Sequence, residues 1–235
     1  MPKTTLVERL KALTTPHLAD ACLRVGALVR CAHPGLRAIA PGMRCAGRVR
    51  PARHAGSVDV FLEALKSTDP GDVLVIDNAG RLDEACIGDL VALEALRAGL
   101  GGMVVWGLHR DTDELIEIGL PIFSLGTIPT GPQRLDPRPR DALLSASVGP
   151  FVLTSADFVA ADADGVIFLA ETGLSDIVSV AEAIRTTERE QAHKMRNGTS
   201  LREQVRFEEY IERREANPRW TFREHLRTVG GAIEE

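Results

Sequence analysis

The chain has 235 residues, of which 44% are hydrophobic and 4% aromatic, and its formal net charge is −5 at pH 7. This composition predicts one large buried core, with or without an appendage, and argues against disorder throughout. The acidic balance and the scarcity of aromatic rings argue against nucleic acid as a partner. The sequence contains neither a membrane-length apolar run nor a signal peptide, so we expect no membrane partner and a cytoplasmic location.

The N-terminal part predicts helices followed by an irregular region. Residues 4–26 read as mostly helical, with Thr15-Pro16 opening a second helix that Gly26 closes. Residues 27–58 are rich in glycine, proline and arginine, which predicts loops and short strands. The amphipathic segment from Val58 to Lys66 predicts a further helix.

The middle of the chain predicts alternating strands and helices. The apolar run Val73–Ile76 is typical of a strand that is covered on both faces. After it we expect a helix from Asp89 to Ala98, a strand Met103–Trp106, a short helix Asp113–Ile118 and a strand at Pro121–Ser124. This order predicts a parallel βαβαβ core, whose ligands would bind at the carboxyl ends of the strands.

Two apolar pieces near residue 165 predict a hairpin, and a change of character follows them. Phe158-Val159 and Val166–Leu169 flank the turn-forming segment 161–165. From Ser175 onward the sequence is helical and heavily charged. We therefore predict an α/β domain over residues 1–172 and a helical extension over residues 173–235.

The extension leaves two interpretations open. Ser200 and Glu203 form a capping box that begins a second helix. One interpretation is a solvated helical tail. The other is an arm that packs on a neighbouring subunit through Trp220, Phe222 and Leu226.

The first candidate site is the start of the predicted helix at Gly88-Asp89-Leu90-Val91. A helix N-terminus presents unpaired N–H groups and the positive end of the helix dipole, so the amides of Leu90 and Val91 can receive a substrate carboxylate. The alternative is that Asp89 only caps its helix, and both roles are compatible.

The second candidate site is Arg110-Asp111, just beyond a predicted strand end. Neighbouring side chains in an extended segment diverge, so each can face something other than its neighbour. Asp111 could then hold a divalent cation, largely through waters, while Arg110 binds a ligand oxygen. The alternative is a plain ion pair. His109 is either a general base or a polar loop residue, and Asp77 reads as a turn former beside the same cleft.

Several common site motifs are missing from the sequence. The glycine cluster 99–102 precedes a strand, whereas a dinucleotide fingerprint must follow one. The sequence has no Walker loop, nucleophile elbow or HExxH motif. The four cysteines are widely spaced, and we read them as free thiols.

Five motifs follow one another at characteristic spacings along the chain. They are Gly71–Asp77, Gly88-Asp89-Leu90, Gly107–Asp111 with Glu114, Pro121-Ile122-Phe123 and Ala161–Val166. Their order and spacing resemble the RraA-like superfamily. That group includes the class II, metal-dependent 4-hydroxy-4-methyl-2-oxoglutarate/4-carboxy-4-hydroxy-2-oxoadipate aldolases and the regulators of ribonuclease E.

The resemblance implies a swivelling β/β/α-type fold and homotrimers or hexamers with active sites at subunit interfaces. It implies that Asp111 holds Mg²⁺ or Mn²⁺, that Arg110 contacts the pyruvyl oxygen and that Asp89 positions a water for proton transfer. The Leu90 and Val91 amides, beside Gly88, would take the substrate carboxylate.

The implied activity is a divalent-metal lyase that cleaves a small 2-oxo acid through a metal-stabilised pyruvate enolate. The same chemistry would serve oxaloacetate decarboxylation. Aldolases of this group also use an acid from the C-terminal region of a neighbouring subunit, for which Glu182 and Glu188 are candidates. The alternative is a non-catalytic regulator that binds a protein partner such as a ribonuclease.

Overall fold

The computed structural model describes residues 3–230, and within them eight strands form one mixed sheet. The strand order is β1-β12-β11-β3-β4-β6-β8-β2. The sheet is curled, so that β12 approaches β2 near the opposite edge. The strands are β1 (Arg30–Cys31), β2 (Arg37–Ala38), β3 (Cys45–Arg53), β4 (Val73–Asp77), β6 (Gly102–Trp106), β8 (Ile122–Ser124), β11 (Asp157–Asp162) and β12 (Gly165–Ala170).

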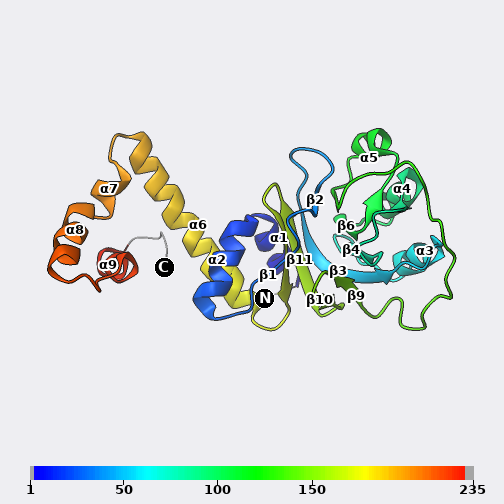
Figure 1. Ribbon diagram of the computed structural model, residues 1–235, viewed down its shortest axis with the longest axis horizontal. Coiled ribbons are helices and arrows are strands. Elements are labelled where there is room, and N and C mark those ends of the chain that lie inside the picture. The colour runs from blue at the N-terminus through cyan, green and yellow to red at the C-terminus, as the bar shows by residue number, and fades with distance from the viewer. Residues whose placement is uncertain (1–2, 231–235) are drawn as a thin grey trace.

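The parallel half of the sheet positions the candidate site. Strands β3, β4, β6 and β8 run parallel, with Val75 of β4 paired to Pro51 and Val104. Helix α3 (Asp59–Leu65) leads into β4, α4 (Asp89–Arg97) into β6 and α5 (Thr112–Ile118) into β8, and all three lie at one end of the molecule (Figure 1). The mixed α/β fold predicted from the sequence is confirmed, and so is the β11–β12 hairpin.

Strand β3 is longer than the short strands that its composition predicts. Its nine residues pair with β4 on one side and with β11 on the other. The arginines fit because their charged ends reach acidic partners: Arg48 bonds Glu171 and Arg50 bonds Asp72. Pairing on both edges therefore supplies the hydrogen bonds that a loop of this composition would take from water.

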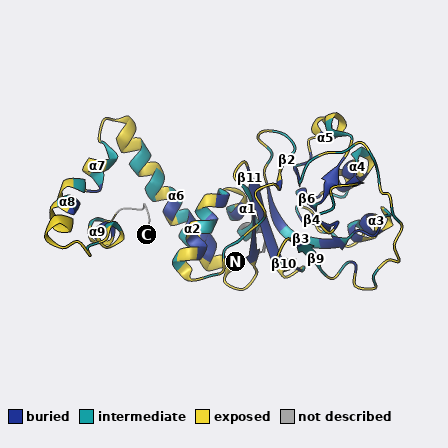
Figure 2. Ribbon diagram, viewed as in Figure 1, coloured by how far each residue is buried: buried dark blue, intermediate teal, exposed yellow. Residues whose placement is uncertain are grey.

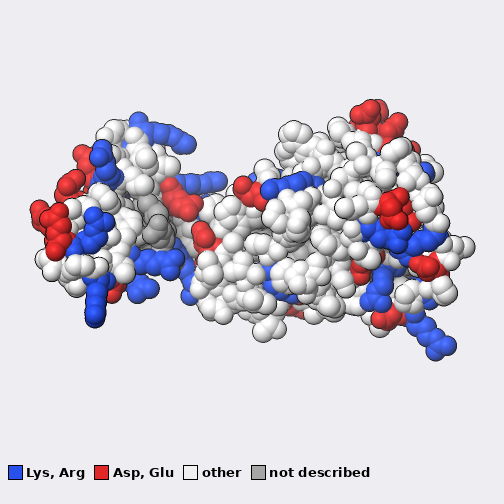
Figure 3. Space-filling model, in the orientation of Figure 1, with Lys and Arg blue, Asp and Glu red and all other residues white. Residues whose placement is uncertain are grey.

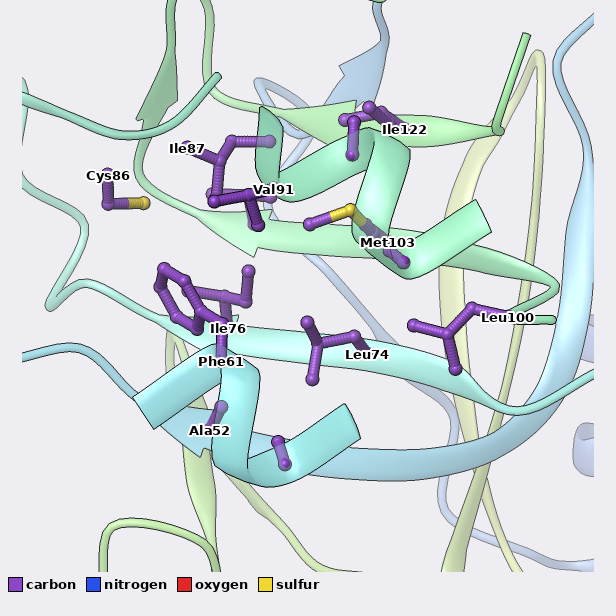
Figure 4. Close-up of a cluster of buried hydrophobic side chains, with 14 of the residues drawn as sticks. Ala52, Phe61, Leu74, Ile76, Cys86, Ile87, Val91, Leu100, Met103 and Ile122 are labelled. Atoms are coloured by element: carbon purple, nitrogen blue, oxygen red, sulfur yellow. The ribbon is translucent and has the colours of Figure 1, made fainter. Parts of the chain in front are cut away.

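The core is divided among three apolar clusters, which the burial pattern in Figure 2 follows. One cluster lies between the sheet and helices α3 to α5, where Phe61, Leu74, Ile76 and Met103 are fully buried (Figure 4). A second fills the inside of the curl. The third lies under α1 (Lys3–Lys11), α2 (Thr15–Val25) and the first half of α6 (Leu174–Arg196).

The C-terminal helices extend away from this body (Figure 1). The apolar contacts of α6 with the body end at Ile184, a contact of Glu188 with His17 of α2 follows, and the helix then projects outward. Beyond it, α7 (Leu201–Gln204), α8 (Phe207–Ala216) and α9 (Phe222–Val229) gather around a small cluster of their own. Tyr210 and Leu226 are buried there, and the Tyr210 and Phe222 rings lie 4.9 Å apart.

The apolar side chains considered as anchors have partners within the arm. Phe222 contacts Phe207 and Tyr210, and Leu226 is buried. The solvated tail and the intersubunit arm both stay predictions. Trp220 lies 5.6 Å under the guanidinium of Arg213. The arm satisfies its few apolar side chains internally because three short helices can fold back on one another. The division of the chain at residues 172 and 173 stays a prediction.

Two surface properties accompany this fold. Acidic and basic side chains are interspersed over the arm and over the end with α3 to α5, without a face of one sign in the view of Figure 3. Among the described helices, none has both the length and the apolar character needed to cross a bilayer.

Candidate functional site

Two short strands that the sequence did not reveal bring the two candidate motifs together. Strand β5 (Ala85–Ile87) ends just before Gly88, and β7 (Leu108–His109) ends just before Arg110. The two pair in parallel, and the Arg110 N–H donates to the Ile87 carbonyl at 3.1 Å. Both strands leave the carboxyl edge of the main sheet, where ligands of α/β proteins bind. The juxtaposition of the motifs is therefore built into the backbone.

Gly88 is required by what packs on it. Its φ of −150° is open to any residue, yet a Cβ at this position would lie 2.3 Å from Oδ2 of Asp111 and 3.4 Å from Nε of Arg110. Gly131 is similar, because a Cβ there would lie 3.0 Å from Nη1 of Arg110. The Arg110 side chain thus runs between two glycines from distant parts of the chain.

The Arg110 and Asp111 side chains do not diverge, which corrects the sequence-based expectation. Asp111 has a left-handed backbone, with a φ of 58°, at the N-cap position of α5, and its side chain makes no capping hydrogen bond. Its Oδ2 lies 3.5 Å from Arg110 Nε, and the two side chains are 34% and 48% exposed. The pair is therefore open to solvent and can exchange its mutual contact for a ligand at little cost.

The N-terminus of α4 faces the same place. Its first amides have no acceptor within the helix. The Asp89 N–H points to Asp111 Oδ2 at 3.4 Å, and the Leu90 N–H donates to the carboxylate of Asp89 at 2.7 Å. The Asp89 carboxylate thus accepts the hydrogen bond of the Leu90 amide, one of the two amides predicted to bind substrate. Val91, the third residue of this turn, is buried.

A cavity of about 160 Å³ lies against these groups. Most of its wall is apolar, while Arg110 and Asp89 supply the charged groups. The lining residues are Val58, Ala85, Cys86, Ile87, Gly88, Asp89, Leu90, Val91, Arg110 and Pro132.

His109 and Asp77 have structural partners. The His109 ring is buried between the hydroxyl groups of Ser124, at 2.8 Å, and Thr112, at 3.0 Å. Burial lowers the pKa of His109, so the ring is held neutral near pH 7. Asp77 accepts backbone N–H groups of Ala79 and Ser147, in agreement with its predicted role as a turn former. His109 therefore aligns the segment before Arg110 and does not face the cavity.

The two acids considered for a neighbour's site lie on α6 and have partners within the chain. Glu182 accepts two hydrogen bonds from Arg9, at 2.6 and 2.9 Å. These bonds are the main reason why the pKa of Glu182 is lowered. Glu188 lies 3.0 Å from Nε2 of His17. Both acids help to fasten α6 to the N-terminal helices.

The donor set at Asp111 fits a hard cation. Within residues 3–230, no three His, Cys, Asp or Glu side chains gather in the way a complete protein cage needs. Mg²⁺ commonly takes one or two carboxylates and keeps several waters, whereas structural zinc needs four protein ligands. The exposed oxygen of Asp111 therefore suits Mg²⁺ or Mn²⁺ and does not suit zinc. The cysteines are free thiols, as predicted.

Known proteins resemble this chain in sequence and in structure. The 4-hydroxy-4-methyl-2-oxoglutarate aldolase of Thermus thermophilus is 34% identical over 128 residues, which are 54% of this chain and 77% of that protein. A relative from Alcanivorax borkumensis, which carries the same aldolase name provisionally, is 33% identical over 45% of this chain and 64% of its own length. The structure of Streptomyces coelicolor RraAS2, described as an unusual member of the RNase ES inhibitor RraA family, has a TM-score of 0.70 and 26% identity. That likeness covers 83% of this chain and all of the other.

A family model described as Aldolase/RraA matches residues 15–168. The match begins at α2, ends within β12 and contains both motifs of the candidate site. The chain belongs to the RraA-like family.

Proposed function

We propose that the protein is a divalent-metal-dependent lyase that cleaves a small 2-oxo acid and releases pyruvate. Aldol cleavage of a substrate like 4-hydroxy-4-methyl-2-oxoglutarate is the leading reaction, and decarboxylation of oxaloacetate is the second. The observation that carries the proposal is the packing of Arg110 and Asp111 on Gly88, at the N-terminus of α4 and beside a small cavity. The aldolase names of two relatives support it.

Asp111 would hold Mg²⁺ or Mn²⁺. When bound, the cation supplies Lewis-acid polarisation of the substrate's 2-oxo group. Arg110 lies beside Asp111, so its guanidinium adds a positive charge where the oxygen becomes negative as the carbon–carbon bond breaks. Arg110 is 48% exposed and lies 3.5 Å from Asp111, so this contact forms without breaking a buried network.

The N-terminus of α4 would bind the substrate carboxylate. A carboxylate placed there replaces Asp89 as the acceptor of the Leu90 N–H, which is now 2.7 Å from the Asp89 side chain. The released Asp89 carboxylate can then hold a water that takes the proton of the 4-hydroxyl group and later returns one to the pyruvate carbon. Substrate binding and preparation of the proton carrier are thereby coupled.

The assembly that we propose is a homotrimer or hexamer with sites at subunit interfaces. Three exposed apolar side chains on α4, Leu90, Leu93 and Leu96, support this arrangement, because a covering subunit would bury them together. The proposed location is the cytoplasm.

Pyruvate release tests the function. A coupled assay with each of the two substrates, with Mg²⁺ and with chelator, should show turnover that depends on the metal. Asp111→Ala should abolish that turnover and the binding of Mn²⁺ in calorimetry, while its thermal unfolding stays close to that of the parent protein. Unchanged turnover in this variant would reject the assignment of the metal to Asp111.

A second candidate is a non-catalytic regulator that binds a ribonuclease. The observation that favours it is the likeness to S. coelicolor RraAS2 over the whole length of that protein. Absence of turnover with both substrates, together with saturable inhibition of a ribonuclease E type enzyme, would support this candidate instead.

A further inference from the structure

The segment 130–136 beside the candidate site is held by hydrogen bonds to a buried glutamate, and neither the catalytic proposal nor the family match explains these bonds. Residues 130–136, here called the strap, cross from the cavity to the far side of the sheet's carboxyl edge. Pro132 lines the cavity, and Gly131 lies against the Arg110 guanidinium. Most strap residues are exposed, so their apolar contacts alone do not hold them in place.

The strap is fastened to one fully buried carboxylate. Glu84, just before β5, has no exposed surface. One of its oxygens accepts the Gln133 N–H at 2.8 Å, and the other accepts Nε of Arg134 at 3.0 Å. The adjacent Ala85 N–H donates to the Thr130 carbonyl at 2.9 Å. Both ends of the segment that contacts Arg110 are thus bound to the start of β5.

Arg134 extends this fastening to the main sheet. Its Nη2 donates to the Asn78 side chain at 2.9 Å and to the His54 carbonyl at 3.3 Å, just beyond β4 and β3. Burial raises the pKa of Glu84, but the bonds from Gln133 and Arg134 and the charges of Arg134 and Arg81 lower it by more. Glu84 therefore remains a carboxylate, and a buried carboxylate is stable only while these partners stay in place.

We propose that Glu84 is a positioning residue for Arg110. It holds the strap so that Gly131 and Pro132 form the wall against which the guanidinium lies. Arg110 itself is half exposed, and its contact to Asp111 is a weak one at 3.5 Å, so the wall limits the directions in which its side chain can turn. The inference rests on the proposed function only where it concerns turnover, since the position of Arg110 can be measured without a substrate.

Glu84→Gln tests the inference, with Asp136→Asn as the matched control. Asp136 also bonds Arg134, but its carboxylate is 55% exposed and is not among the groups that line the cavity. In Glu84→Gln we expect the Gln133 amide to exchange hydrogen about tenfold faster, the consequence of losing one charge-assisted bond. The Nε–H signal of Arg110 in NMR spectra, assigned through its loss in Arg110→Lys, should shift. Neither change is expected in Asp136→Asn.

Arg134→Lys is the second variant, in case Glu84→Gln does not fold. It keeps the charged Glu84 carboxylate and removes the Nε–H group that Glu84 accepts. Both variants should lower kcat of pyruvate release with little change in KM, the pattern of a lost transition-state contact. An unmoved Arg110 signal in folded Glu84→Gln or Arg134→Lys would overturn the inference. A protein that releases no pyruvate but shows the Arg110 shift would refute the proposed function and leave this inference standing.

Discussion

Gly88→Ala separates the geometry of the site from the stability of the fold. The backbone at Gly88 accepts alanine, so the whole effect comes from the new methyl group. It would lie 2.3 Å from Oδ2 of Asp111, where ordinary contacts begin near 3.4 Å, and the carboxylate must therefore retreat by about 1 Å. Overpacking costs about 1–3 kcal/mol, and the partly exposed Asp111 can swing outward, which favours the lower end.

We expect Gly88→Ala to lower the melting temperature by about 2–4 °C, as about 1 kcal/mol does in a chain of this size. A displacement of about 1 Å at a reacting group costs about 100-fold in rate, so kcat/KM for pyruvate release should fall by that order. Gly101→Ala is the control, because its Cβ would lie 2.8 Å from the Gly71 carbonyl, away from the site. It should lose stability and keep its turnover per folded molecule. Full activity in Gly88→Ala would refute the proposed role of this packing.

Three further predictions concern other parts of the molecule. Because burial lowers the pKa of His109, the unfolded chain binds more protons below about pH 6.5, so the free energy of unfolding should fall from there toward pH 5. Urea titrations of His109→Asn should show a smaller fall, and an identical pH dependence would contradict this. Burial raises the pKa of Cys45 and Cys86 to about 12, so iodoacetamide at pH 8 should label exposed Cys31 in the native protein and spare these two. Leu226→Ala should cost the arm about 2–5 kcal/mol and speed hydrogen exchange in residues 200–230 alone, whereas faster exchange in β4 would show that the arm supports the body.

Local patterns were sufficient for much of the fold. Helix α4 was predicted from Asp89 to Ala98 and runs from Asp89 to Arg97, because an acidic start, an apolar stripe and Gly99 all lie within one short segment. The capping box at Ser200 likewise forms as predicted. Strands β4, β6 and β8 were recognised because each is a continuous apolar run, whereas the arginine-rich β3 was expected as loops and short strands.

The same reasoning failed where an element exists only through a distant partner. Strands β5 and β7 have three and two residues, too few for any periodicity, and they are strands because they pair with each other. Asp111 is left-handed at the start of α5, and its carboxylate lies toward Arg110 instead of away from it. Local sequence carries no information on such pairing, which depends on backbone brought together by the rest of the fold.

The sequence by itself determined helix α4, strands β4, β6 and β8, the resemblance to the family and the two motifs of the candidate site, because each depends on residues that are close along the chain. The tertiary structure alone decided that Gly88 lies under Asp111 and Arg110, and that Glu84 fastens the strap beside them. These contacts join residues 22 to 50 positions apart. Their geometry follows from the pairing of β5 with β7 and from buried hydrogen bonds between distant segments. The residues next to each group in the sequence do not reveal such pairing.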